Sequence, residues 1–204
     1  MRFCLLLTLL LGLPLPALAG GVLVMGDSIS AAYGLDKSRG WVALLTTRLQ
    51  QNCHGETVIN ASVSGETSAG GLARLPALIK QHQPELVIIE LGGNDGLRGL
   101  SPMSMRANLK AMVVQSRASG ARVVLLGMRI PPNYGQAYTQ LFDQQFRLLA
   151  EQLQLPWVPF FLQGVVQAGQ LQADGIHPTA AAQPALLENA WPLIRNNLSA
   201  PCRP

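Results

Sequence analysis

The 204-residue chain is long enough to form one domain with a substantial hydrophobic core. Apolar residues make up 49% of it and charged residues only 13%, a composition that excludes a disordered chain. Its net charge of +4 is small and evenly spread, so we expect no nucleic-acid partner.

Residues 1–19 have the pattern of a secretory signal peptide. The apolar run Phe3–Leu13 follows a single arginine and is too short to span a bilayer. Ala17-Leu18-Ala19 then fits the cleavage pattern of small residues at alternate positions. We therefore expect cleavage near Ala19-Gly20, a single mature domain over 20–204, and a periplasmic or secreted protein without a stable membrane anchor.

The mature chain alternates short apolar runs with apolar stripes at helical spacing. The runs predict five strands, at Val22–Met25, Thr57–Ala61, Leu86–Leu91, Val123–Gly127 and Trp157–Val158. The stripes predict five helices, marked by Trp41 to Leu49, Leu72 to Ile79, Leu109 to Val113, Leu141 to Leu153, and Leu187 to Leu198. We expect Pro192 to kink the last helix or to end a segment of it. This alternation predicts an α/β fold, a three-layer α/β/α sandwich with a flavodoxin-like five-stranded parallel sheet in the order 2-1-3-4-5.

A tight turn with a serine follows the first predicted strand. Gly26 breaks the apolar run, and Asp27 and Ser28 come next. A serine on a strand-to-helix turn can project its hydroxyl group out of the sheet and direct its backbone N–H toward a developing negative charge. Taken alone, the same residues also fit a plain helix cap.

An aspartate and a histidine three residues apart precede the last predicted helix. On a turn that contains Gly175, Asp174 can reach Nδ1 of His177 and leave Nε2 free as a base. Pro178 restricts the histidine to extended dihedral angles and so favours a defined turn. A solvated turn with an incidental histidine is the alternative.

Two further turns follow the second and third predicted strands. Gly65 lacks a side chain, so a substrate oxygen can approach its N–H closely. Asn94 provides a neutral amide donor that suits an oxyanion. Ordinary turns explain each segment in isolation, but all four segments fall on the rim of the sheet where this topology places ligands.

Four blocks of the sequence resemble those of the SGNH, or GDSL, hydrolase family. They are Gly26-Asp27-Ser28-Ile29-Ser30, Ser64-Gly65-Glu66-Thr67, Gly92-Gly93-Asn94-Asp95 and Asp174-Gly175-Ile176-His177-Pro178. Further similarity, at 71–78, 92–99 and 129–135, extends to the bacterial TesA-like subgroup of multifunctional thioesterase I, arylesterase and lysophospholipase. Glu66 departs from the aspartate expected in this subgroup, and Ile130 from the expected leucine.

The resemblance implies a serine esterase that hydrolyses small acyl ester and thioester substrates through an acyl-enzyme intermediate. Ser28 would be the nucleophile, and Asp174 and His177 would complete the triad. The N–H groups of Ser28 and Gly65 and the side chain of Asn94 would form the oxyanion hole. The mechanism requires no metal and no organic cofactor.

Apolar residues on the rim loops are candidates for acyl-chain binding: Leu97, Ile130, Pro131 and Tyr134, and also Leu100, Pro132 and Phe161. Each of them could instead pack beneath a loop. A carbohydrate O-acetyl esterase with a small polar rim and a non-catalytic acyl-binding protein are alternative functions. We expect a monomer.

Export makes a disulfide between the two mature cysteines permissible. Cys53 lies between the first helix and the second strand, and Cys202 follows the last helix. In the predicted topology these two helices share one face and both end opposite the candidate site. A Cys53–Cys202 disulfide is therefore expected to hold the C-terminal segment.

Overall fold

Five parallel strands form one sheet in the computed structural model, which describes residues 20–53, 56–199 and 202. The strands are β1 (Gly20–Gly26), β2 (Val58–Asn60), β3 (Pro84–Glu90), β4 (Arg122–Leu126) and β5 (Trp157–Val158). Their order, β2-β1-β3-β4-β5, confirms the predicted topology. The central strands β1 and β3 are buried along almost their whole length, as expected of parallel strands covered on both faces.

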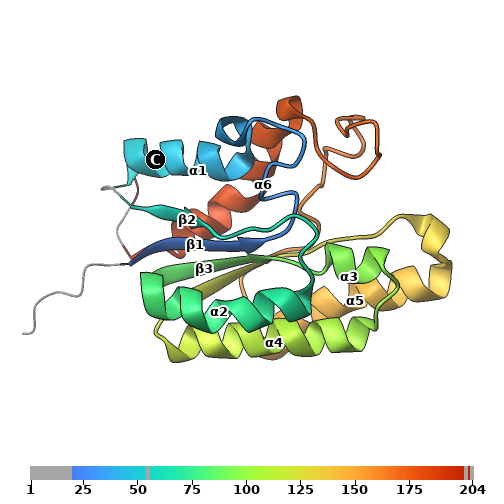
Figure 1. The fold of residues 1–204 in the computed structure, drawn as a ribbon, viewed down its shortest axis with the longest axis horizontal. Coiled ribbons are helices and arrows are strands. Elements are labelled where there is room, and N and C mark those ends of the chain that lie inside the picture. Colours follow the sequence, from blue (N-terminus) through green and yellow to red (C-terminus); the bar gives the residue numbers. More distant parts are fainter. Residues whose placement is uncertain (1–19, 54–55, 200–201, 203–204) are drawn as a thin grey trace, which may run out of the picture.

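Helices cover both faces of the sheet (Figure 1). One face carries α1 (Trp41–Asn52) and α6 (Gln183–Asn196). The other carries α2 (Ser68–His82), α4 (Pro102–Ala118) and α5 (Gln136–Leu153). The sequence did not predict the short helix α3 (Gly93–Leu97), which follows β3. Three 3₁₀ turns, η1 (Lys37–Arg39), η2 (Pro132–Tyr134) and η3 (Ala180–Ala182), lie in the connections.

Two helices differ in detail from the sequence prediction. Helix α6 runs through Pro192 to Asn196, so of the two expected effects Pro192 does not end the helix, and Leu198, the last residue of the predicted stripe, is buried beyond the helix end. In α5, Leu141 is 37% exposed, because the buried stripe runs through Phe142, Phe146 and Leu149 instead. The adjacent position lies about 100° around a helix, which turns Leu141 away from the core.

The register between β1 and β3 places the ends of both strands level with each other. Val24 pairs with Ile88, and Gly26 pairs with Glu90. The turns after Gly26 and after Glu90 therefore emerge side by side at the carboxyl edge of the sheet. This is the point at which the strand order reverses and where ligands bind in such folds.

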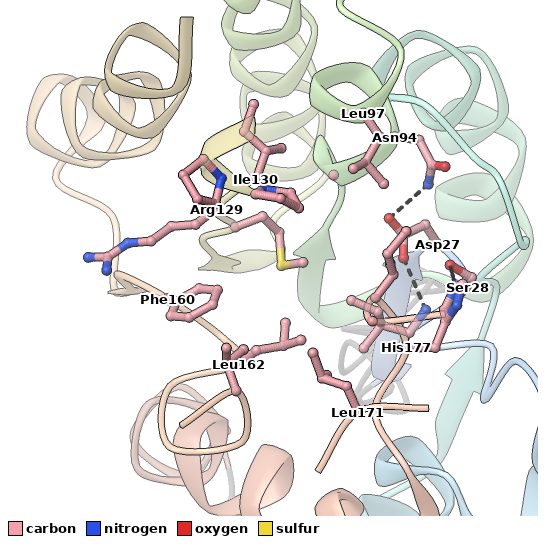
Figure 2. A pocket seen from close by; sticks show the side chains of 18 residues that line it. Asp27, Ser28, Asn94, Leu97, Arg129, Ile130, Phe160, Leu162, Leu171 and His177 are labelled. Atoms are coloured by element: carbon pink, nitrogen blue, oxygen red, sulfur yellow. Dashed lines mark hydrogen bonds between the residues drawn. The ribbon is translucent and has the colours of Figure 1, made fainter. Parts of the chain in front are cut away.

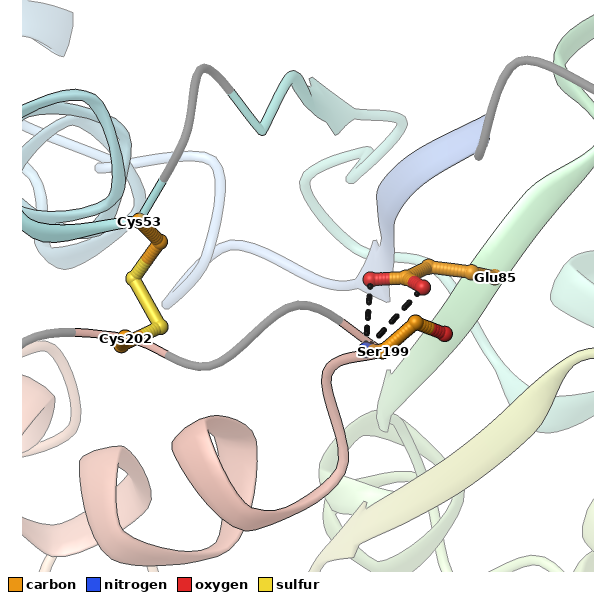
Figure 3. The surroundings of a disulfide bond; sticks show 4 residues. All are labelled: Cys53, Glu85, Ser199 and Cys202. Atoms are coloured by element: carbon orange, nitrogen blue, oxygen red, sulfur yellow. Dashed lines mark hydrogen bonds between the residues drawn. A yellow bond between two sulfur atoms is a disulfide. The ribbon is translucent and has the colours of Figure 1, made fainter.

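A disulfide joins Cys53 and Cys202, whose Cα atoms are 4.3 Å apart (Figure 3). Polar contacts also hold Leu198 and Ser199, just after α6. The Ser199 N–H donates to both carboxylate oxygens of Glu85, at 3.3 and 3.2 Å, and Arg122 donates to the Leu198 carbonyl at 2.9 Å. The disulfide thus ties Cys202 to the end of α1, and the polar contacts tie Leu198 and Ser199 to the beginnings of β4 and β3.

Candidate active site

Ser28 lies on a tight turn directly after β1. The carbonyl of Asp27 accepts the Ala31 N–H at 3.0 Å, and the carbonyl of Ser28 accepts the Tyr33 N–H at 2.9 Å. A Cβ at Gly26 would lie only 2.6 Å from that of Ser30, so the turn requires a glycine here. Ser28 itself is only 9% exposed.

His177 and Asp174 complete a chain of hydrogen bonds with this serine. His177 Nε2 lies 2.8 Å from Ser28 Oγ, and His177 Nδ1 lies 2.6 Å from Asp174 Oδ2. A neutral imidazole that donates from Nδ1 to the carboxylate leaves Nε2 to accept the serine proton. The structure therefore brings together the three residues that the sequence placed on two distant turns.

The turn that carries Asp174 holds its carboxylate in the charged form. Asp174 Oδ1 accepts the N–H groups of Ile176 and His177 at 2.9 and 3.0 Å. Hydrogen bonds from the backbone and side chain of His177, and then from the Ile176 N–H, lower the pKa of Asp174 to about 2. Gly175 provides the positive φ of 69° that this turn needs.

Two expected oxyanion donors lie on the turns beside Ser28. Asn94 is on α3, and its Nδ2 donates to Asp27 Oδ2 at 3.0 Å (Figure 2). An amide nitrogen has two hydrogens, so the second remains for a substrate oxygen. In the described part of the chain, neither the Ser28 nor the Gly65 N–H donates to a protein acceptor.

The loop that carries Gly65 is tied to its neighbours on both sides. The Val63 N–H donates to the Gly26 carbonyl at 3.1 Å, which places this loop against the Ser28 turn. Arg98 donates to the Gly65 carbonyl at 2.8 Å, and Gly65 has a φ of 80°. Glu66, the residue that departs from the subgroup pattern, accepts from Arg74 Nε at 2.7 Å. This bond ties the loop to α2.

Two acidic side chains are buried beneath the Ser28 turn. Glu90 is fully buried at the end of β3, and its Oε2 accepts the Ser30 O–H at 2.7 Å and the Asp27 N–H at 3.3 Å. Trp41 Nε1 donates to Ser30 Oγ at 3.1 Å. Burial raises the pKa of Asp27 to about 6 and, together with the charge of Asp27, raises the pKa of Glu90 well above its usual range.

Sequence reasoning missed Glu90. The signal available was a single acidic residue at the end of an otherwise apolar strand, since a carboxyl group in such a place needs polar partners.

A cavity of about 520 Å³ opens beside the triad. Figure 2 shows Asp27, Ser28 and His177 on one side of it, and Arg129 and Phe160 on the opposite side. Its walls are mostly apolar, and three of the four residues that we singled out for substrate binding line it: Leu97, Ile130 and Pro131.

Some of the expected wall residues lie elsewhere. Tyr134 is not part of the lining, because it donates its hydroxyl group to the Leu97 carbonyl at 3.0 Å and so braces the outside of α3. Phe161 is fully buried in the core, and Leu100 is 45% exposed, whereas Pro132 does line the cavity.

Most of the cavity-lining residues that the sequence analysis missed follow β5 in the chain. Phe160, Leu162, Val166, Leu171 and Ile176 all line the cavity. The signal was the long irregular stretch from Phe160 to Pro178, which is rich in apolar residues although a solvated loop would not need them.

Within the described ranges, no cluster of three or more His, Cys, Asp or Glu side chains could hold a metal ion. None of the helices in the described ranges has the length and hydropathy to cross a bilayer.

A hydrogen-bonded serine, histidine and aspartate at the carboxyl edge of a parallel sheet define a serine hydrolase. Comparison with known proteins identifies the group within this class. The model of the GDSL-like lipase/acylhydrolase family matches residues 24–184. The chain therefore belongs to that family, which confirms the predicted class of ester-bond hydrolase.

Individual relatives support the same assignment. The chain is 57% identical over 181 residues to "Esterase TesA" of Pseudomonas aeruginosa, covering 88% of this chain and 90% of that protein. It is 44% identical over 173 residues to "Thioesterase 1/protease 1/lysophospholipase L1" of Escherichia coli strain K12, with 84% and 82% covered. A solved structure titled "Crystal Structure of TesA" is 56% identical, with a TM-score of 0.84, and the match covers 87% of this chain and 99% of that one.

Proposed function

We propose that the enzyme hydrolyses carboxylic esters and thioesters of acyl chains, including aryl esters, acyl thioesters and lysophospholipids, through an acyl-enzyme intermediate on Ser28. The observation that carries this proposal is the 2.8 Å contact between Ser28 Oγ and His177 Nε2 at the edge of a large apolar cavity. The printed names of the relatives, which include an esterase and a thioesterase/lysophospholipase, support it.

Acylation begins at Ser28. As its Oγ attacks the acyl carbonyl carbon, the hydroxyl proton moves to His177 Nε2. The Asp174 carboxylate, held charged by its turn, stabilises the imidazolium that forms.

The negative charge that develops on the carbonyl oxygen needs donors that are already in place. The N–H groups of Ser28 and Gly65 and the amide of Asn94 supply them. Asn94 is held by Asp27, so its amide need not reorient when the charge appears.

The intermediate then collapses as His177 Nε2 gives its proton to the departing alcohol or thiol, and the acyl group stays on Ser28 Oγ. Water next loses a proton to His177 and attacks the acyl carbon, and the free acid leaves as Ser28 recovers its proton. Esters and thioesters share this path, and no step requires a metal or an organic cofactor.

The cavity favours an acyl chain over an acetyl group on a sugar. Phe160, Leu162 and Leu171 give the cavity an apolar wall on the side away from Asn94 (Figure 2), where a sugar would need polar partners. Each buried methylene group contributes about 0.8 kcal/mol, so chain length should affect binding.

We also propose that the enzyme is exported and acts as a monomer. Export rests on the signal-peptide pattern of residues 1–19, which lie outside the described residues. Cell fractionation with N-terminal sequencing tests export, and a mature chain that does not begin near Gly20 would contradict it. Size-exclusion chromatography with light scattering tests the monomer.

Hydrolysis of p-nitrophenyl butyrate by the purified enzyme is the direct test of the reaction. Wild type should turn over, and Ser28→Ala should lose both turnover and labelling by an organophosphate. Labelling at another serine would defeat the assignment of the nucleophile, and acyl binding without turnover would identify a binding protein. Rates with palmitoyl-CoA, a lysophospholipid and aryl esters then rank the substrate classes.

A further inference from the structure

Tyr33 places an exposed aromatic ring against the imidazole of His177. The two ring centroids are 4.5 Å apart, with an interplanar angle of 37°. Tyr33 is nevertheless 51% exposed and does not line the acyl cavity. Because about half of the Tyr33 side chain is exposed, it contributes little to the hydrophobic core, whereas its ring contacts the imidazole of the proposed catalytic base.

Hydrogen bonds on both sides fix the backbone of Tyr33, from which the ring projects. The Tyr33 N–H donates to the Ser28 carbonyl at 2.9 Å. Gln172 Nε2 donates both to the Tyr33 carbonyl at 2.9 Å and to the Pro178 carbonyl at 3.0 Å. One amide group therefore joins the loop that carries Ser28 to the loop that carries His177.

Backbone strain next to Tyr33 supports the same interpretation. Ala32 has a φ of 58°, a left-handed conformation that residues other than glycine adopt at a cost. Such conformations persist where the surroundings enforce them, often near functional sites. Here the strained residue directly precedes Tyr33 and is itself 6% exposed, packed where a Cβ at Gly40 would touch it.

His177 needs a restraint that Asp174 alone does not supply. The bond to Asp174 fixes Nδ1, but the ring can still swing about that contact and carry Nε2 away from Ser28. The side chain of Asp174 is 37% exposed, so water competes for its oxygens. Contact on the face of the ring opposes this swing.

We propose that Tyr33 is a positioning residue that keeps His177 Nε2 in line with Ser28 Oγ, and that Gln172 clamps the two loops that carry them. This inference rests on the proposed serine-hydrolase function of the same site. Because histidine moves the proton in both half-reactions, the loss of Tyr33 must slow acylation and deacylation alike.

Kinetics of Tyr33→Ala and Tyr33→Phe test the proposal. Since a misplacement of about 1 Å can cost about 100-fold in rate, we expect Tyr33→Ala to lower kcat by about 10- to 100-fold with little change in KM. Burst and steady-state phases should slow by similar factors, for an aryl ester and for an acyl thioester. Tyr33→Phe keeps the ring and should retain the rate within about twofold. Gln172→Ala should share the kcat defect.

Val114→Ala, at a 52% exposed position near the end of α4, is the matched control and should leave the rates and the melting temperature unchanged. A wild-type kcat in Tyr33→Ala would overturn the proposal. A loss confined to aryl esters and to acylation would also overturn it, because that outcome identifies a contact with the leaving group.

A readout without turnover separates this inference from the proposed function. ¹³C relaxation of the labelled His177 ring should show lower order in Tyr33→Ala than in wild type or Tyr33→Phe. An equally ordered ring in all three refutes the positioning role, even if the wild type hydrolyses no ester. If the ring loosens but wild type lacks turnover, only the proposed function fails.

Discussion

Asp27 should make the stability of the enzyme depend on pH in an unusual direction. Asp27 is 3% exposed, and burial outweighs the hydrogen bonds from Ile29 and Asn94 to raise its pKa from 3.8 to about 6. Between these two values the folded state keeps a proton that the unfolded state has released. The contribution of Asp27 to stability therefore falls as the pH rises through this window.

The size of the effect follows from the shift. A rise of about two pKa units corresponds to about 3 kcal/mol of unfolding free energy, which is fully present only below the unfolded pKa of 3.8 and is lost by about pH 7. Asp27→Asn removes the titrating group. Urea denaturation at several pH values from 4 to 7 should show wild type losing about 2 kcal/mol relative to the variant.

Neighbouring carboxyl groups do not obscure this comparison. The pKa of Asp174 is lowered to about 2, so the titration of Asp174 changes the unfolding free energy at pH values below this window. The charge of Asp27 helps to raise the pKa of Glu90, so Asp27→Asn should also make the pKa of Glu90 less raised. The stability of the variant then falls less with rising pH, which increases the expected loss of wild type relative to the variant. Asp36→Asn is the control, because hydrogen bonds from Ser38 lower the pKa of Asp36 and place its linkage below the window as well.

A constant difference between wild type and Asp27→Asn from pH 4 to 7 would refute this reasoning. It would mean that Asp27 does not titrate in this range, and that its burial is compensated by contacts other than those described.

Three further predictions follow from the site and the fold. Asn94→Ala should lower kcat by about 100- to 1,000-fold, through loss of an oxyanion donor; an unchanged kcat on p-nitrophenyl butyrate would exclude that role. Ile130→Phe should fill part of the cavity and slow hydrolysis of a palmitoyl ester much more than that of a butyryl ester, whereas equal slowing would argue against acyl binding there. Cys202→Ser should lower the unfolding free energy by about 2–5 kcal/mol in denaturant. A reductant should produce the same loss in wild type but none in the variant, and an unaffected wild type would contradict this.

Much of the fold could be predicted because parallel strands covered on both faces leave a plain pattern. The apolar runs at Val22–Met25 and Leu86–Leu91 are almost continuous, so the two central strands were evident, and the order of the sheet followed from connection rules. The same rules predict that the carboxyl ends of all five parallel strands lie on one rim of the sheet. Ser28 and His177 could therefore be placed together although 149 positions separate them.

What the sequence did not yield depends on contacts between distant segments. The hydroxyl group of Tyr134 donates to the Leu97 carbonyl on α3. No local sequence pattern distinguishes this contact from a position in the cavity wall. Leu141 and Phe142 are adjacent and both apolar, so only packing decides which of them enters the core. The hydroxyl group of Ser30, which donates to the carboxyl group of Glu90, is 60 positions away in the sequence.

The buried side chains of Asp27 and Glu90 lower the stability of the fold at neutral pH. Their hydrogen bonds, however, join parts of the site that lie far apart in the sequence. Asp27 accepts from Asn94, and its own N–H donates to Glu90, so a single residue connects the ends of β1 and β3. Ser28, the proposed nucleophile, follows β1, and Asn94, the proposed oxyanion donor, follows β3. Because Asp27 bonds to both Asn94 and Glu90, a displacement of β1 against β3 would strain these two hydrogen bonds, which therefore oppose a change in the distance between Ser28 and Asn94.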